Sequence, residues 1–123
     1  MRGWVVVLAA VAGAAEAHGA DDARGRALFK EHCAACHTLR AHQPPSFGPT
    51  LQGLIGRPAG AVDGYPYSPA MAGAGLVWSE AALDAYLAGP EAALPGTAMR
   101  FPGLAAAADR ADLIAYLARA AAP

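Results

Sequence analysis

Apolar residues recur three and four positions apart in three segments of the chain, a spacing that gives an α-helix one buried face. The segments predict helices over residues 22–35, over 80–88 with Ser79 as the N-cap, and over 106–121. Their inward faces are Gly25, Leu28, Phe29 and Cys33 in the first helix, Leu83, Tyr86 and Leu87 in the second, and Leu113, Ile114, Tyr116 and Leu117 in the third. The charged residues of the third helix, Asp109, Arg110, Asp112 and Arg119, are expected to face water.

Between these helices the chain is rich in turn-forming residues. Residues 40–67 contain many Gly and Pro and show no sustained period, which indicates loops. Residues 68–73 predict one short helix, with Ser68 as N-cap, Pro69 in the first position and Gly73 at the end. A second irregular stretch runs from Pro95 to about Gly103. Because no segment alternates like a strand, the pattern predicts an all-α chain whose centre is filled by something besides side chains.

The first 17 residues differ from the rest. Arg2 precedes an apolar run over residues 4–15, and Ala-Glu-Ala at 15–17 fits a cleavage site before His18. This pattern is typical of a secretory signal peptide, and the run is shorter than the ~20 residues of a membrane-spanning helix. We therefore expect a signal peptide over 1–17, one domain over 18–123, and a periplasmic protein.

Composition limits the remaining possibilities. The chain has 123 residues, of which only 7% are aromatic, so a small domain of this kind needs extra stabilisation such as a cofactor. Residues 18–123 carry 8 basic and 9 acidic side chains, with Lys30 as the single lysine. No basic cluster indicates nucleic-acid binding, and no apolar segment after the leader is long enough to span a membrane.

The only two cysteines, Cys33 and Cys36, stand three residues apart, and His37 follows directly. Cys-x-x-Cys-His is the attachment pattern of haem c. Each thiol adds across one vinyl group, and one helical turn brings both sulfurs to the same edge of the ring. Since His37 adjoins Cys36, its imidazole is placed to meet the iron. The motif predicts one covalently bound haem c.

Three other uses of the cysteines compete with haem. A thiol redox pair usually belongs to a βαβ pattern, which this sequence lacks. A closed zinc site needs four ligands, and His32 and His42 are poorly placed to complete a tetrahedron. A structural disulfide suits a protein outside the cytosol. The trailing histidine and the predicted leader both favour haem.

A haem iron used for electron transfer normally has a second protein ligand. His32 and His42 lie too close to His37 to reach the opposite face, so we expect them to be solvated residues of a helix end or a loop. Met71 lies in the short predicted helix and could instead belong to the core. Met99 follows the Pro95-Gly96 turn in an irregular segment, which can present a side chain to a cofactor, and it is the favoured ligand.

The sequence resembles the class I cytochromes c, specifically mitochondrial cytochrome c and its bacterial relatives. The resemblance covers about residues 25–120 and rests on CAACHTL, FGPTLQGLIGRPAG, GYPYS, the Trp78-Ser79-Glu80 helix start, AYLAGP, PGTAM and ADLIAYL, in that order. It implies the class I cytochrome c fold, with about four to five helices and long loops wrapped around one covalently bound haem. It also implies that Gly25 and Phe29 cross Leu113 and Tyr116.

The resemblance assigns roles to ten residues. It implies thioethers at Cys33 and Cys36, and iron ligation by His37 and Met99. The carbonyl of Pro49 would bind the other imidazole nitrogen of His37. The other implied haem contacts are Arg57, Tyr67 and Trp78 at the inner propionate, Tyr86 near the methionine sulfur, and Thr97 near the end of the ligand loop.

Three positions depart from the family pattern. Lys30 stands alone where mitochondrial relatives surround the haem edge with lysines, so we expect weak electrostatic steering. Met71 replaces an asparagine near the propionates, and Ala98 replaces a lysine before the ligand methionine.

The expected function is electron transport without catalysis. The resemblance implies a monomeric carrier that moves one electron at a time between larger redox complexes through transient contacts. One alternative is a dedicated electron-transfer subunit or donor bound to one dehydrogenase or oxidase. Another is an enzyme or gas sensor with an open iron site, which would require that Met99 is not a ligand.

Overall fold

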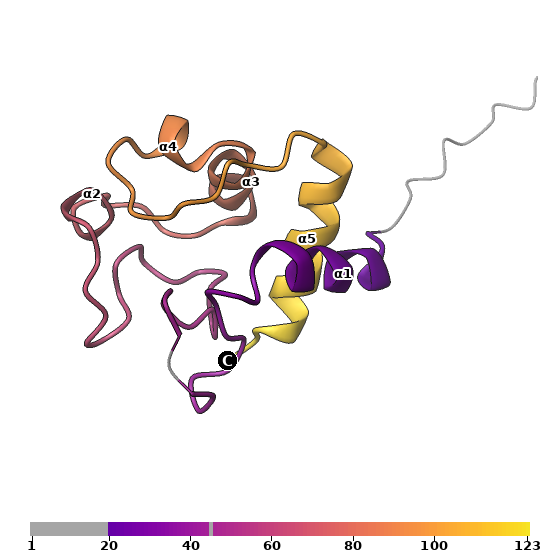
Figure 1. Cartoon of the computed structure of the whole chain (residues 1–123), viewed down its shortest axis with the longest axis horizontal. Helices are drawn as coiled ribbons and strands as arrows, with labels where there is room; N and C mark the ends of the chain where they lie inside the picture. Colours follow the sequence, from indigo (N-terminus) through magenta and orange to yellow (C-terminus); the bar gives the residue numbers. More distant parts are fainter. Residues whose placement is uncertain (1–19, 45) are drawn as a thin grey trace, which may run out of the picture.

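The computed structural model describes residues 20–44 and 46–123, and the predicted signal peptide lies outside this part of the chain. The described residues form five helices, α1 (Asp22–His32), α2 (Pro69–Ala72), α3 (Glu80–Ala88), α4 (Pro90–Ala93) and α5 (Ala107–Ala120), joined by long loops (Figure 1). They contain no strand, only one isolated bridge between Pro58 and Val77. The expected all-α class is therefore confirmed. None of the described helices has the length and hydropathy needed to cross a membrane.

Helix α1 begins where the sequence predicts and ends earlier. The Asp21 side chain accepts a hydrogen bond from the Arg24 amide at 3.0 Å, which caps the first turn. The helix was expected to continue to residue 35, but it ends at His32 because the chain tightens into a turn over residues 33–36. The amides of Cys36 and His37 both donate to the Cys33 carbonyl, at 3.0 and 2.9 Å. This turn presents the Cys-x-x-Cys-His motif.

The terminal helices cross at Gly25, where α1 lies against α5 (Figure 1). A Cβ atom at Gly25 would overlap the backbone carbonyl of Asp112 and lie 2.7 Å from the Tyr116 Cβ. Beside this contact the Phe29 and Tyr116 rings pack with centroids 5.9 Å apart. The expected crossing is thus observed, and every residue predicted for the inward faces of α1, α3 and α5 is buried.

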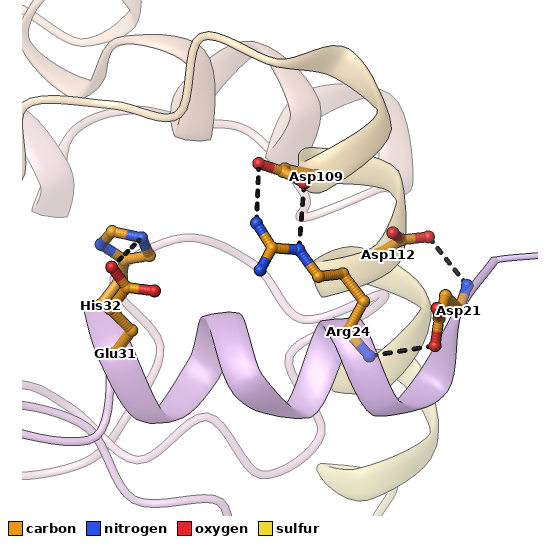
Figure 2. Close-up of polar contacts among 6 residues, drawn as sticks. All are labelled: Asp21, Arg24, Glu31, His32, Asp109 and Asp112. Atoms are coloured by element: carbon orange, nitrogen blue, oxygen red, sulfur yellow. Dashed lines mark hydrogen bonds and ion pairs between the residues drawn. The ribbon is translucent and has the colours of Figure 1, made fainter.

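Polar contacts fasten the same crossing at its edge (Figure 2). Arg24 of α1 reaches Asp109 of α5 at 3.4 Å, and the Asp21 amide donates to the Asp112 carboxylate at 2.8 Å. Arg110 was expected to face water, and that expectation is wrong. Its side chain is 13% exposed, because it pairs with Asp84 of α3 at 2.8 Å and donates to the carbonyls that precede α5.

Capping residues fix the shorter helices. Ser68 and Ser79 cap α2 and α3 by accepting hydrogen bonds from Met71 and Ala82, at 3.2 and 3.1 Å. Gly89 ends α3 as expected, but Pro90 then starts a single turn, α4, that the sequence pattern did not predict. A four-residue turn is too short to show a helical period.

Candidate cofactor site

A cavity of about 340 Å³ lies between the helices and the loops, a size in the range of cofactor pockets. All ten residues that the sequence assigned to haem binding line it: Cys33, Cys36, His37, Pro49, Arg57, Tyr67, Trp78, Tyr86, Thr97 and Met99. Buried leucines complete the walls, namely Leu51, Leu54, Leu83, Leu87 and Leu117. The cavity is therefore mostly apolar, with polar groups at a few places.

The two cysteines stand on the turn that follows α1. No disulfide joins them in the described structure, and Cys33 is buried while Cys36 is exposed. Burial, and secondarily the charge of Cys36, raises the pKa of the Cys33 thiol to about 11, so before haem attachment this thiol is protonated at pH 7. Among the described residues no three His, Cys, Asp or Glu side chains gather as a metal site.

The ring of His37 is held in one orientation by the backbone that follows. Its Nδ1 lies 2.8 Å from the Pro49 carbonyl oxygen, which can only accept, so Nδ1 carries the proton and Nε2 keeps its lone pair. Burial lowers the pKa of His37, opposed in part by the Pro49 hydrogen bond, and nearby Arg57 lowers it further. The imidazole is therefore neutral and available as a ligand at pH 7.

Gly48 makes this orientation possible, and the sequence analysis did not single it out. A Cβ atom there would lie 2.5 Å from Cε1 and 2.7 Å from Nδ1 of His37. The Gly48 amide also donates to the Cys36 carbonyl at 2.6 Å. The sequence signal that could have identified Gly48 is its place directly before Pro49, the predicted partner of His37.

Arg57 supplies positive charge at one side of the cavity. Its Nη1 donates to the carbonyls of Thr50 and Gln52, both at 2.9 Å, while its buried Nε has no hydrogen-bond partner among the described residues. Burial lowers the pKa of Arg57, and Tyr67 raises it, yet a guanidinium stays charged in proteins. A buried N–H without a partner is costly, so this position favours an anionic group in the cavity.

Tyr67 and Trp78 line the cavity together with Arg57. The Tyr67 hydroxyl accepts from the Val62 amide at 3.0 Å, which leaves its own proton free to donate. Backbone hydrogen bonds tie Trp78 to the Arg57 loop, since the Trp78 amide donates to the Arg57 carbonyl at 2.9 Å. The structure thus brings the three residues expected at the inner propionate to one cavity.

On the remaining wall, Tyr86 and Thr97 share a buried hydrogen bond of 2.7 Å between their hydroxyl groups. The Met99 amide donates to the Thr97 hydroxyl at 3.4 Å, and the Trp78 and Tyr86 rings pack with centroids 5.1 Å apart. Burial raises the pKa of Tyr86, partly offset by the Thr97 hydrogen bond, and Glu91 raises it again, so the phenol is neutral. These contacts fix the loop that carries Met99.

The other candidate ligands are also placed by the structure. Met71 is half-buried and lines the same cavity as Met99. His32 ends α1 as expected, but it also lines the cavity and packs on Phe101, with centroids 5.7 Å apart. His42 is exposed and lies away from the cavity.

The residues present fit a haem c. Cys33 and Cys36 stand at one edge of an apolar cavity, a neutral histidine adjoins them, and Arg57 provides an unpartnered donor for a carboxylate. An all-α fold with this site defines a class I c-type cytochrome.

The comparisons with known proteins agree with that class. The family model for cytochrome c matches residues 23–121, and the chain belongs to the cytochrome c family. Similar proteins include cytochrome c of Gibberella zeae, 46% identical over 80% of this chain and 93% of the relative. Cytochrome c of Theileria parva is 48% identical over 81% of this chain and 86% of its own. Cytochrome c2 of Rhodomicrobium vannielii is 44% identical over 92% of this chain and 90% of the relative.

The family membership establishes the cofactor. The protein carries one haem c, with its iron, attached through thioethers to Cys33 and Cys36, and it is a single-haem electron carrier.

Proposed function

We propose that this protein is exported to the periplasm, where it works as a soluble monomer carrying electrons between larger redox complexes. His37 and Met99 are its axial iron ligands in this proposal. The observation that carries it is the convergence of His37, Met99, Arg57 and both cysteines on one apolar cavity. Bound there, the haem supplies a one-electron couple, and the chain's residues set its orientation and surroundings.

Different hydrogen bonds orient the two proposed iron ligands. Pro49 fixes the His37 tautomer and so directs the Nε2 lone pair away from the backbone. Thr97 holds the Met99 amide and is itself held by Tyr86. A soft thioether ligand and apolar walls both favour the less charged ferrous state, so the proposal includes a high reduction potential.

The proposed contacts to a haem propionate follow from the hydrogen-bond donors that line the cavity. The Nε of Arg57 and the hydroxyl proton of Tyr67 are both available to a carboxylate. Such partners offset the cost of keeping a charge away from water. We assign the inner propionate to this side of the cavity, with Trp78 beside it.

The location rests on the leader pattern. Residues 1–17 have the order of a signal peptide, and in bacteria haem c is attached after export. Weak steering suits a carrier that meets its partners briefly, because the chain has a net charge of −1 and a single lysine.

Cell fractionation combined with a redox titration tests the proposal. The full chain, expressed in a bacterial host that matures c-type cytochromes, should appear in the osmotic-shock fraction with the mass of residues 18–123 plus haem. It should sediment as a monomer and titrate reversibly with one electron. Recovery only in the cytoplasm, or only in a fixed complex with a dehydrogenase or oxidase of its native host, would contradict the free periplasmic carrier.

A further inference from the structure

Phe47 is an unusual feature of the cavity wall. Three large apolar side chains are exposed in the described part of the chain: Phe47 at 86%, Val77 at 52% and Ile55 at 37%. Of these only Phe47 lines the cofactor cavity. Covering an exposed phenylalanine ring with another apolar surface is worth up to ~3 kcal/mol of burial free energy. That free energy becomes available when another surface covers the ring.

The backbone on both sides of this ring is fixed. The Phe47 carbonyl accepts a hydrogen bond from the Tyr65 hydroxyl at 2.9 Å. The next amide, that of Gly48, donates to the Cys36 carbonyl at 2.6 Å. Phe47 is thus tied to the cysteine turn and to a second cavity residue. An aromatic side chain on an ordered backbone loses little entropy on binding, as is typical of interface anchors.

The charges around the cavity differ from those of the whole chain. The chain has more acidic than basic residues, yet no Asp or Glu lines the cavity. Arg100 does line it, and this exposed side chain makes no ion pair among the described residues. By contrast, the arginines at 24, 110 and 119 are neutralised by aspartates on the helices. The other arginine of the cavity, Arg57, is half-buried and donates to two backbone carbonyls. Arg100 is therefore the one exposed arginine among the residues that line the cavity.

We propose that Phe47 is the apolar anchor of a docking surface, and that Arg100 provides its single charge contact. The matching partner is a redox protein with an apolar patch bordered by a few carboxylates, rather than one with a strongly acidic face. This inference rests on the proposed electron-carrier function. Burial of one ring is insensitive to salt, and a single exposed charge contributes little, so docking persists at high ionic strength.

Voltammetry at a coated gold electrode tests this surface with a defined probe. The holoprotein is adsorbed on a mixed monolayer of methyl- and carboxylate-terminated alkanethiols, and affinity is read from redox-active coverage against protein concentration. Phe47→Ser should weaken binding about tenfold at low salt and at about 1 M salt, where charges are screened beyond ~3 Å. Val77→Ser, the matched loss of an exposed apolar side chain away from the cavity, should bind within about twofold of the parent.

The variant Arg100→Gln measures the contribution of the charge to binding separately from that of the Phe47 ring. It should lower affinity a few-fold at low salt on the carboxylate-containing monolayer, and have no effect at high salt or on methyl groups alone. Equal behaviour of Phe47→Ser and Val77→Ser, or release of the parent protein by salt alone, would overturn the proposal. A reversible titration of the parent in free solution tests the electron-carrier function separately, so a failure of docking is not confused with a failure of redox activity.

Discussion

Two neighbouring residues, Gly48 and Pro49, set the position of the proximal histidine. Gly48 leaves space for the His37 ring, and the Pro49 carbonyl binds the ring nitrogen at 2.8 Å. Neither residue supplies a reactive group. They act by geometry, one through the absence of a side chain and the other through a carbonyl that can only accept. This pair therefore offers a direct test of the site at the scale of single atoms.

Gly48→Ala should destabilise the holoprotein by about 1–3 kcal/mol, because the new Cβ would overlap the His37 ring and the ring cannot move without losing its Pro49 bond. Urea unfolding followed by absorbance measures the change. Gly89→Ala is the matched control, since its Cβ would lie 3.7 Å from Ala92, an ordinary contact. Its effect should be about 1 kcal/mol or less. Equal losses in both variants would refute this view of Gly48.

At the scale of elements, the site depends on α1 and α5, which do not themselves provide iron ligands. Their crossing at Gly25 holds α1 against α5, and the cysteine turn follows directly from the other end of α1. The Phe29–Tyr116 contact and the Arg24–Asp109 pair surround the same crossing. The packing of these two helices therefore sets the place of the helix from which the cysteine turn extends.

Two effects of the substitution Gly25→Ala on stability oppose each other. Alanine improves the helix by about 1 kcal/mol, but the added Cβ meets the Asp112 carbonyl and the Tyr116 Cβ. Because the backbone of α5 cannot shift easily, we expect the free energy of unfolding to fall by about 1–3 kcal/mol, as measured with denaturant. Ala27→Gly, at an exposed position of the same helix, isolates the propensity term and should cost about 1 kcal/mol. An increase in stability for Gly25→Ala would show that the close approach is not limiting.

The elements that could be predicted from the sequence are those long enough to repeat a period. Helices α1, α3 and α5 follow this rule, and the inward residues of each are buried. The α4 turn has four residues and no period, and Arg110 has an ordinary surface pattern although Asp84 and two carbonyls hold it half-buried. Tertiary contacts decide such cases, and they are not encoded in local spacing.

The residues of the site also divide into those that the sequence predicted and those that it did not. The Cys33-Cys36-His37 motif predicts haem attachment because its spacing matches the two vinyl groups and the iron, and the turn before Met99 favoured that residue as the second ligand. The family resemblance located the other six assigned residues that line the cavity. Leu51, Leu54 and Gly48 were not singled out, since they lie in a Gly- and Pro-rich segment where no pattern separates wall residues from turns. Their place follows only from the loop's path around the cofactor.

For the molecule as a whole, the cofactor cavity and the hydrophobic core are one structure. The leucines that line the cavity are members of the core cluster. Among the described helices, α5 packs against α1 and α3, and α3 also packs against α4. A chain of this size has little further apolar surface to bury. The haem therefore contributes to folding as well as to redox chemistry.

The double variant Cys33→Ala/Cys36→Ala should lose covalent haem and, with it, cooperative folding. Exposing the leucine walls removes several kcal/mol of burial, which is comparable to the whole stability of a small domain. Far-ultraviolet circular dichroism during heating should show a low helix signal and no sharp transition, in contrast to the haem-loaded parent. A cooperative melt like that of the parent would mean that the core is sufficient by itself.

The claim that links residue, element and molecule is the assignment of His37 and Met99 as iron ligands within this cavity. The most direct measurement is the weak near-red absorption band of the oxidised holoprotein, which reports a methionine sulfur bound to haem iron. The account predicts that the band is present in the parent, persists in Met71→Leu and disappears in Met99→Leu. A band that survives in Met99→Leu and is lost in Met71→Leu would contradict it, as would a parent protein without the band.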